Sequence, residues 1–213
     1  FDEDTLITMN DGTKKKIIDI KVGDILIDDN AVTATFKLEA KGSTMYYLEN
    51  ITVSNSHIVM YKDRWIHVSE HPDAIKHAYY EKPYLYCLNT AYKTLEINGI
   101  TFTDWDELYG DDINEIKNNG VVRIDHLENI HTEFDSGFAG TTKIKLKNGT
   151  YKEIKDICID DVLEHGETVY GLVKINGKNI SEQFTYTLGN TVVEGGPNLP
   201  MCDKNVRVKT TLY

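Results

Sequence analysis

The stretch FDEDTLITMNDGTKKKIIDIKVGDILIDDNAVTATFK, residues 1–37, occurs a second time as FAGTTKIKLKNGTYKEIKDICIDDVLEHGETVYGLVK, residues 138–174. The two stretches align without a gap, 137 positions apart, and thirteen of the 37 paired positions are identical. Unrelated stretches of average composition would share roughly two or three. The identities therefore mark the residues that one repeated supersecondary unit requires, among them Phe1/Phe138, Thr5/Thr142, Gly12/Gly149, Ile17/Ile154, Asp24/Asp161 and Leu26/Leu163.

Short alternating segments separated by tight-turn residues dominate the chain. In each copy a turn, Asn10-Asp11-Gly12 or Lys147-Asn148-Gly149, separates two such segments. Short strands with Gly and Asn between them are typical of a β-sandwich, a barrel or a related folded-over sheet. The sequence therefore predicts an all-β protein, with strands at Thr5–Met9, Lys16–Ile20, Ile25–Leu26, Met45–Leu48, Ile51–Val53, His57–Tyr61, Trp65–Val68, Leu85–Leu88, Thr94–Ile97, Thr101–Phe102, Ile144–Leu146, Ile154–Ile157 and Val162–Leu163.

The repeat also divides the chain. We expect a first domain over residues 1–109, an acidic connector over 110–136 and a partial second copy over 137–213. The connector holds the only segment with a helical pattern, Asp111–Asn118, with an acidic cap and Gly120 as its stop.

Composition excludes several classes of function. The 213 residues are 40% hydrophobic and 27% charged, which is typical of a folded globular protein. The net charge of −11 and the absence of a basic cluster argue against nucleic-acid binding. No apolar run is long enough to span a membrane. Three cysteines at unrelated spacings favour reduced thiols over a disulfide framework, as in the cytoplasm or a virion.

An ordered set of short motifs begins in the first copy and continues beyond it. It comprises Asp4-Thr5, Ile17–Asp24, Val53–His57, Tyr84–Leu88 and Ile97–Ile100. In this order and spacing the set resembles the Hint family, the self-processing module of inteins and hedgehog proteins, and looks most like the Hint-like segments of large DNA viruses and phages. The resemblance implies an all-β horseshoe with pseudo-two-fold symmetry, here followed by a tandem, partial second Hint-like copy.

The resemblance also implies a single-turnover reaction without a cofactor. In the family a cysteine, immediately before the position of Phe1, attacks the carbonyl before it and forms a thioester, a step suited to a thiolate. The partners implied are the protein's own upstream segment as substrate and water or a small nucleophile as acceptor. At the corresponding place the second copy has Gly137, which cannot attack a carbonyl.

His57 is the first candidate catalytic residue. In the family a Thr-x-x-His motif places this histidine on the scissile amide nitrogen, which it later protonates, and imidazole chemistry suits both tasks. Here the motif reads Ser54-Asn55-Ser56-His57, so that a serine hydroxyl replaces the threonine. The resemblance assigns Ser54 and Thr5 to the orientation of backbone groups. The alternative is a histidine that only packs within a strand.

Cys87 is the second candidate. It stands where many inteins have an aspartate that tunes the nucleophile, and where one intein class without the first cysteine has its initial nucleophile. A buried, inert thiol is the alternative. Thr187 is expected at the equivalent place in the second copy.

Asp104 stands close to the place of the asparagine that completes splicing in the family. A carboxylate does not release a chain by succinimide formation at a useful rate, and no His-Asn pair is present. We therefore expect cleavage without efficient splicing, with Asp104 as a base that activates the acceptor or simply as a solvated carboxylate.

A metal site is not expected. His67, His71 and His77 lie close together in the sequence, but their spacing fits no zinc pattern. The sequence thus predicts autocatalytic cleavage upstream of the first copy. Its competitor is a non-catalytic Hint-derived β scaffold or binding module of a larger viral protein.

Overall fold

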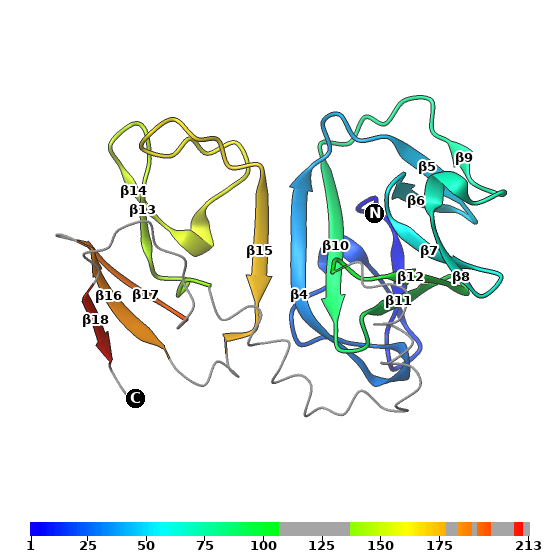
Figure 1. Cartoon of the computed structure of the whole chain (residues 1–213), viewed down its shortest axis with the longest axis horizontal. Coiled ribbons are helices and arrows are strands. Elements are labelled where there is room, and N and C mark those ends of the chain that lie inside the picture. The colour runs from blue at the N-terminus through cyan, green and yellow to red at the C-terminus, as the bar shows by residue number, and fades with distance from the viewer. Residues whose placement is uncertain (107–136, 178–182, 189–190, 197–206, 211–213) are drawn as a thin grey trace. The chain divides into compact units, whose positions relative to one another are not determined.

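The computed structural model describes residues 1–106, 137–177, 183–188, 191–196 and 207–210. The expected all-β class is confirmed, because these residues form short antiparallel strands and 3₁₀ turns and no α-helix (Figure 1). The chain forms two compact units, Phe1–Ile124 and Asp125–Tyr213, called here the first and second unit. The expected connector and its helix, Asp111–Asn118, lie outside the described residues, as does Cys202.

The first unit consists of three groups of paired antiparallel strands and one β-hairpin. β4 pairs with β10 and β3, the order β11-β12-β7-β8 forms a second sheet, β6-β5-β9 a third, and β1-β2 the hairpin. The bounds are β1 Leu6–Thr8, β2 Lys14–Lys16, β3 Ile25–Leu26, β4 Asn30–Glu39, β5 Met45–Leu48, β6 Ile51–Ser54, β7 Ile58–Tyr61, β8 Arg64–His67, β9 Ile75–Lys76, β10 Tyr84–Thr90, β11 Thr94–Ile97 and β12 Ile100–Thr103.

Each of these sheets contributes fully buried apolar side chains, and Met45 packs in a cluster with Ala40 and Leu85. Burial of such side chains is the main stabilising contribution to a fold of short strands, about 1.5–3 kcal/mol for each large residue. The fully buried ones include Ile7, Val32, Met45, Leu48, Ile51, Val53, Val59, Leu88, Leu95, Ile97 and Phe102.

Two predicted strands, Lys16–Ile20 and its counterpart Ile154–Ile157, are mostly 3₁₀ turns, formed by Ile17–Asp19 and Ile154–Asp156. The segment Lys16–Ile20 was expected to be extended, but only Lys16 belongs to a strand, and Ile17–Asp19 form a 3₁₀ turn closed by the Ile20 amide on the Ile17 carbonyl at 3.2 Å. Ile17 and Ile20 are buried whereas Ile18 is 44% exposed. Buried positions three apart match the three-residue period of a 3₁₀ turn rather than the two-residue period of a strand.

The longest strand, β4, was not predicted. Along it Val32, Thr33 and Ala34 are all buried, so both faces of the strand are covered and the alternation that signals a strand is lost.

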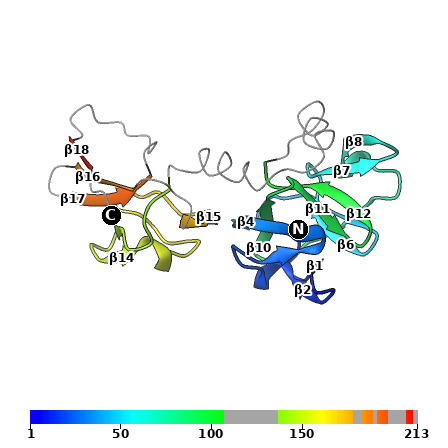
Figure 2. The same cartoon turned by 90° about the horizontal axis from the view of Figure 1, so that it is seen from below.

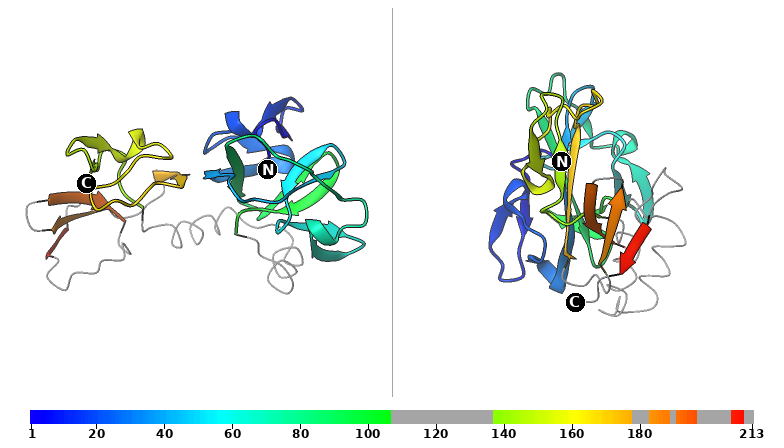
Figure 3. Two further views of the ribbon diagram at one scale, coloured as in Figure 1. Left: turned by 90° about the horizontal axis from the view of Figure 1, so that it is seen from above. Right: turned by 90° about the vertical axis from the view of Figure 1, so that its left-hand side faces the viewer.

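The second unit begins with the same local elements 137 positions later. They are β13 Lys143–Lys145, β14 Tyr151–Glu153 and the 3₁₀ turn Ile154–Asp156. β15 Gly171–Ile175 follows, and then a three-stranded sheet in the order β17-β16-β18, formed by Thr191–Gly195, Phe184–Leu188 and Arg207–Thr210. Figures 2 and 3 show the first segment of each unit, blue in the first unit and yellow-green in the second, folded as a hairpin.

The same hydrogen bonds stabilise the repeated stretch at the start of each unit, residues 1–37 and 138–174, which is called here the opening of the unit. Asp24 accepts from the Lys21 amide at 2.8 Å and pairs with Lys15, and Asp161 accepts from the Cys158 amide at 2.8 Å and pairs with Lys152. The turn glycines Gly12 and Gly149 have φ of 79° and 84°, a left-handed conformation that favours glycine. The repeated sequence therefore specifies the same backbone twice.

The second unit does not support the expected equivalence of Thr187 and Cys87. Thr187 lies in β16, the central strand of a three-stranded sheet, and is exposed. This is the place that Tyr47 occupies in β5, the central strand of β6-β5-β9. Cys87 lies instead in the long strand β10 and is buried.

Candidate functional site

The backbone of Phe1 lies inside the first unit, between strands β6 and β10 (Figure 2). Its nitrogen donates to the Tyr86 carbonyl at 2.9 Å, and the Tyr86 amide donates to the Phe1 carbonyl at 2.9 Å. The next amide, that of Asp2, donates to the Thr52 carbonyl at 2.9 Å. The start of the chain is therefore held as a short, fully bonded strand.

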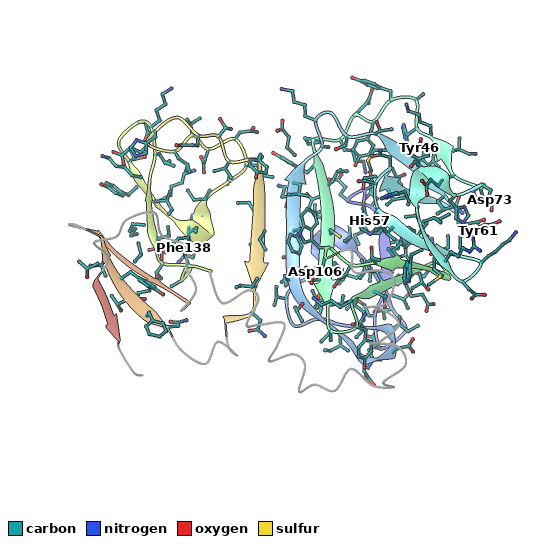
Figure 4. All side chains as sticks on the ribbon, in the orientation of Figure 1. Tyr46, His57, Tyr61, Asp73, Asp106 and Phe138 are labelled. Carbon is teal, nitrogen blue, oxygen red and sulfur yellow. The ribbon has the colours of Figure 1, made fainter. Side chains whose placement is uncertain are left out.

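His57 lies beside Phe1 in the interior (Figure 4). It follows β6 in a turn closed by its own amide on the Ser54 carbonyl at 3.2 Å, and its ring centroid is 4.6 Å from that of Phe1. The His57 Nε2 atom is 3.0 Å from the Thr103 carbonyl oxygen. Because a carbonyl only accepts, Nε2 carries the hydrogen, which leaves Nδ1 as an acceptor in the neutral ring.

Burial lowers the pKa of His57 to about 3. The positive charge of the Phe1 amino group lowers this pKa further, and the hydrogen bond to Thr103 opposes both effects. His57 is therefore neutral at physiological pH, and the Phe1 nitrogen lies within electrostatic reach of its ring.

Cys87 is the third group at this place. It follows Tyr86 in β10, is 5% exposed, and its thiol donates to the Leu88 carbonyl at 3.7 Å. Burial lowers the pKa of the Phe1 amino group, and the nearby side chains of Cys87 and Asp2 oppose that effect. The structure thus brings the Phe1 nitrogen, His57 and Cys87 together, although the sequence separates them by tens of residues.

Main-chain groups of Ser54 and Thr5 form turns around the site. The Ser54 carbonyl closes the turn that leads to His57. The Thr5 amide donates to the Asp2 carbonyl at 3.1 Å, and the Thr5 carbonyl accepts from the Ile17 amide at 2.8 Å. The buried Thr5 hydroxyl has no hydrogen-bond partner among the described residues.

Asp104 has a different environment from the one expected of a solvent-facing base. It is fully buried, and its two carboxylate oxygens accept from the amides of Thr90 at 2.9 Å and Asp106 at 3.0 Å. Burial raises its pKa to about 7, and the positive charge of Lys93 opposes that effect. Asp104 therefore fixes the end of β12, next to the carbonyl that His57 binds, and is not a solvated carboxylate.

A group around Asp2 also holds the start of the chain, and no sequence motif pointed to it. Asp2 is 8% exposed and accepts from the Tyr80 hydroxyl at 2.9 Å and from Lys82 Nζ at 3.0 Å. Lys16 and Lys82 both pair with Asp4, and these ion pairs keep the pKa of the Asp4 carboxyl at about 2. Residues 80 and 82 come some eighty positions later, so no local pattern links them to Asp2.

The three neighbouring histidines have separate contacts. His67 Nδ1 is 2.8 Å from the Ser56 carbonyl, His71 lies edge-on to Tyr61, and His77 bonds the Tyr47 hydroxyl. In Figure 4 Tyr61 and Asp73 mark the outer rim, where His71 Nδ1 is 4.0 Å from Asp73. Among the described residues no group of three or more potential ligands could hold a metal ion.

No family model, no curated protein and no solved structure matches the chain. Within the part of the chain that the structure describes, no helix has the length and apolar character needed to cross a membrane.

Proposed function

We propose that the first unit is a Hint-type self-processing domain that cleaves the peptide bond upstream of the module, without efficient splicing. The observation that supports this most is the convergence of the Phe1 nitrogen, His57 and Cys87 in one buried place. A merely structural start of the chain does not require a neutral, buried imidazole and a thiol beside it. The horseshoe arrangement of the family is part of the same proposal.

The reaction begins with a thiolate attack on the carbonyl carbon of the upstream residue. A carbon–sulfur bond forms, the carbon–nitrogen bond breaks, and the proton of the thiol ends on the departing nitrogen, which becomes a free amine. Water then adds to the thioester carbonyl, which releases the upstream segment as a carboxylic acid and restores the thiol. The thiol is that of a cysteine joined to Phe1, as in the family, or that of Cys87.

His57 transfers the proton between these two partners. Because its resting ring is neutral, it accepts the proton of the thiol first and gives it to the leaving nitrogen afterwards. Nδ1 is the atom that performs this transfer, since Nε2 is bound to the Thr103 carbonyl. When a residue is joined to Phe1, the Phe1 nitrogen is an uncharged amide, so one of the two causes that lower the pKa of His57 is absent in such a chain.

The test uses the full chain with a folded reporter fused upstream through a cysteine next to Phe1. Mass spectrometry should show slow release of the reporter, faster with added hydroxylamine, which captures a thioester. His57→Ala should slow release about 10²–10⁴-fold, which is about 3–5 kcal/mol of barrier. His67→Ala is the matched control, since His67 bonds a different carbonyl at the edge of the unit, and it should change the rate little.

A second pair of fusions identifies the nucleophile. With serine in place of the upstream cysteine, release that persists and is abolished by Cys87→Ser assigns the attack to Cys87. Release that requires the upstream cysteine and survives Cys87→Ser assigns the attack to the upstream cysteine. A reporter that stays attached in every fusion, with the fold intact by circular dichroism, would contradict the proposal and favour a non-catalytic β scaffold.

A further inference from the structure

The pairing of Phe1 with Tyr86 fixes where the preceding residue must begin. Two residues that exchange both N–H···O bonds form a hydrogen-bonded pair of an antiparallel ladder. The next pair in that ladder joins Cys87 to the residue bound to the Phe1 nitrogen. It is a non-hydrogen-bonded pair, in which the Cα atoms are about 4.5 Å apart and the side chains share a face.

Trp105 occupies the following place on the same edge of β10. The Leu88 carbonyl, which a residue two positions upstream of Phe1 would otherwise bind, accepts from the Trp105 amide at 3.0 Å. One residue of β10, Cys87, therefore lies between the place of Phe1 and the place of Trp105. An upstream chain has room to pair for one residue only.

The ring of Trp105 covers this same place. It stacks on Phe36 with the centroids 4.5 Å apart and the planes 17° apart. Phe36 lies in β4 directly opposite Cys87, so these two side chains share a face of the sheet. The Trp105 backbone lies along one edge of β10 and Phe36 lies beyond the other edge, so the indole crosses the strand over Cys87. The indole is 40% exposed, while Cys87 and Phe36 are 5% and 3% exposed.

We propose that Trp105 is a positioning residue for the cleavage proposed above, and the inference rests on that proposed function. The residue joined to Phe1 lies opposite Cys87, beneath the indole. Trp105 turns the chain upstream of that residue away from β10. The linkage to be cleaved is thereby held at a bend next to the thiol rather than along a regular strand. Trp105 also excludes solvent and reagents from that thiol until the upstream residue is in place.

The first experiment measures access to Cys87 in the full chain. Alkylation by iodoacetamide is followed at each cysteine by peptide mass spectrometry, with the exposed thiol of Cys158 as the reference in the same molecule. Trp105→Ala should raise the rate at Cys87 by about tenfold or more relative to Cys158, because the cover is removed. Trp105→Phe should restore protection through stacking on Phe36, and Trp65→Ala, the matched control, should leave the rate unchanged.

Two outcomes would overturn the first half of the proposal. One is a Cys87 that remains as protected in a folded Trp105→Ala protein as in the wild type. The other is an equal gain in Trp65→Ala, which would indicate general loosening of the unit. Should Trp105→Ala not fold, Phe36→Leu replaces it, since this change removes the stacking partner of the indole and should also expose the thiol.

The second experiment tests the bend in the upstream chain. A short extension places a cysteine directly before Phe1 or, in the control, two residues before it. Mild oxidation should join only the first cysteine to Cys87, since the paired Cα atoms lie within the range that a disulfide spans. Equal crosslinking from both positions, or crosslinking only from the second, would contradict the proposed path. Neither experiment depends on cleavage, so a failure of the proposed function and a failure of the proposed path give different results.

Discussion

The openings of the two units have the same backbone and different surroundings. Both contain a hairpin with a glycine turn, a 3₁₀ turn and an aspartate bound to a lysine and an amide. Phe1, however, is 3% exposed and lies against His57 and Phe102, whereas Phe138 is 47% exposed (Figure 4). The difference shows that the repeated stretch specifies a local structure, while the site depends on partners that come later in the chain.

Those partners belong to strands that have no counterpart among the described residues of the second unit. In the first unit Phe1 lies close to residues of three strands. His57 directly precedes β7, Cys87 lies in β10 and Phe102 lies in β12. Among its described residues the second unit has counterparts of β1, β2, β4, β5 and β6, but none of these three strands. A copy of the opening alone therefore has no buried imidazole and no buried thiol beside its first phenylalanine.

Removal of the two equivalent phenylalanine rings should have the largest and most unequal effect. Phe1→Ala leaves a cavity between His57 and Phe102 and should destabilise the first unit by about 3–5 kcal/mol. Phe138→Ala removes a half-exposed ring and should destabilise the second unit by about 1 kcal/mol or less. Hydrogen exchange of the β10 and β17 amides measures the two effects separately. Equal losses would show that the two surroundings do not differ energetically.

Asp104 should give the first unit a pH dependence that the second lacks. Its pKa of about 7 in the folded state exceeds the value of about 3.9 in an unfolded chain. The folded state therefore binds more protons between these values, and the free energy of unfolding falls as the pH rises from about 4 to about 7. His57, with its pKa lowered to about 3, has the opposite effect between about pH 3 and 6.5, because there the unfolded state binds more protons.

The variant Asp104→Asn separates these two contributions. It should cost about 1–3 kcal/mol near pH 4, since an amide cannot accept from both backbone amides that Asp104 binds, and less at neutral pH, where the wild type has lost the contribution of the protonated Asp104. It should also abolish the fall in stability towards neutral pH and leave the rise due to His57. Urea unfolding of the first unit at several pH values measures both effects. An unchanged slope would mean that Asp104 is ionised in the folded protein throughout this range.

Asp24 and Asp161 should respond alike, because their surroundings are the same. Each accepts from a lysine and from a backbone amide three residues earlier. Asp24→Asn and Asp161→Asn should each cost about 1–2 kcal/mol in their own unit. Local hydrogen exchange of the two hairpins is the measurement. A large difference between the two variants would break the equivalence of the two openings.

Deletion of residues 137–213 should have the smallest effect. All of the described groups at the candidate site belong to the first unit, so a folded chain of residues 1–136 with the upstream reporter should cleave within about twofold of the full rate. The time course of reporter release, with circular dichroism as the check on folding, is the measurement. A folded but inactive short chain would show that the second unit contributes to the reaction.

Local signals in the sequence predicted much of the fold. Met45–Leu48 and Thr94–Ile97 begin and end in the structure where the alternation places them. The 3₁₀ turns at Ile17–Asp19 and Ile154–Asp156 were missed because their period differs from that of a strand, and β4 was missed because both of its faces are covered. The strands β9 and β15 to β18 were not predicted either. Local spacing describes one face of one element and cannot show that both faces will be covered.

The candidate site was likewise predicted from the sequence only in part. His57 and Cys87 were singled out from the sequence, and the structure brings them to one place with the Phe1 nitrogen. The contacts of Asp2 with Lys82 and of Trp105 with Phe36 could not be predicted, since they join residues far apart with no shared pattern. Such pairs follow only from the order of strands in the sheets.

The hydrogen bonds between Phe1 and Tyr86 determine how early during synthesis the start of the chain can take its place in the fold. The two residues are 85 positions apart, so the ribosome must make β10 before the start of the chain can be bound. The Thr103 carbonyl that orients His57 is made later still. Closing so long a loop also makes this contact a late event in folding. Under the proposed function, an upstream segment leaves the ribosome, and can fold, well before the groups beside Phe1 can act on it.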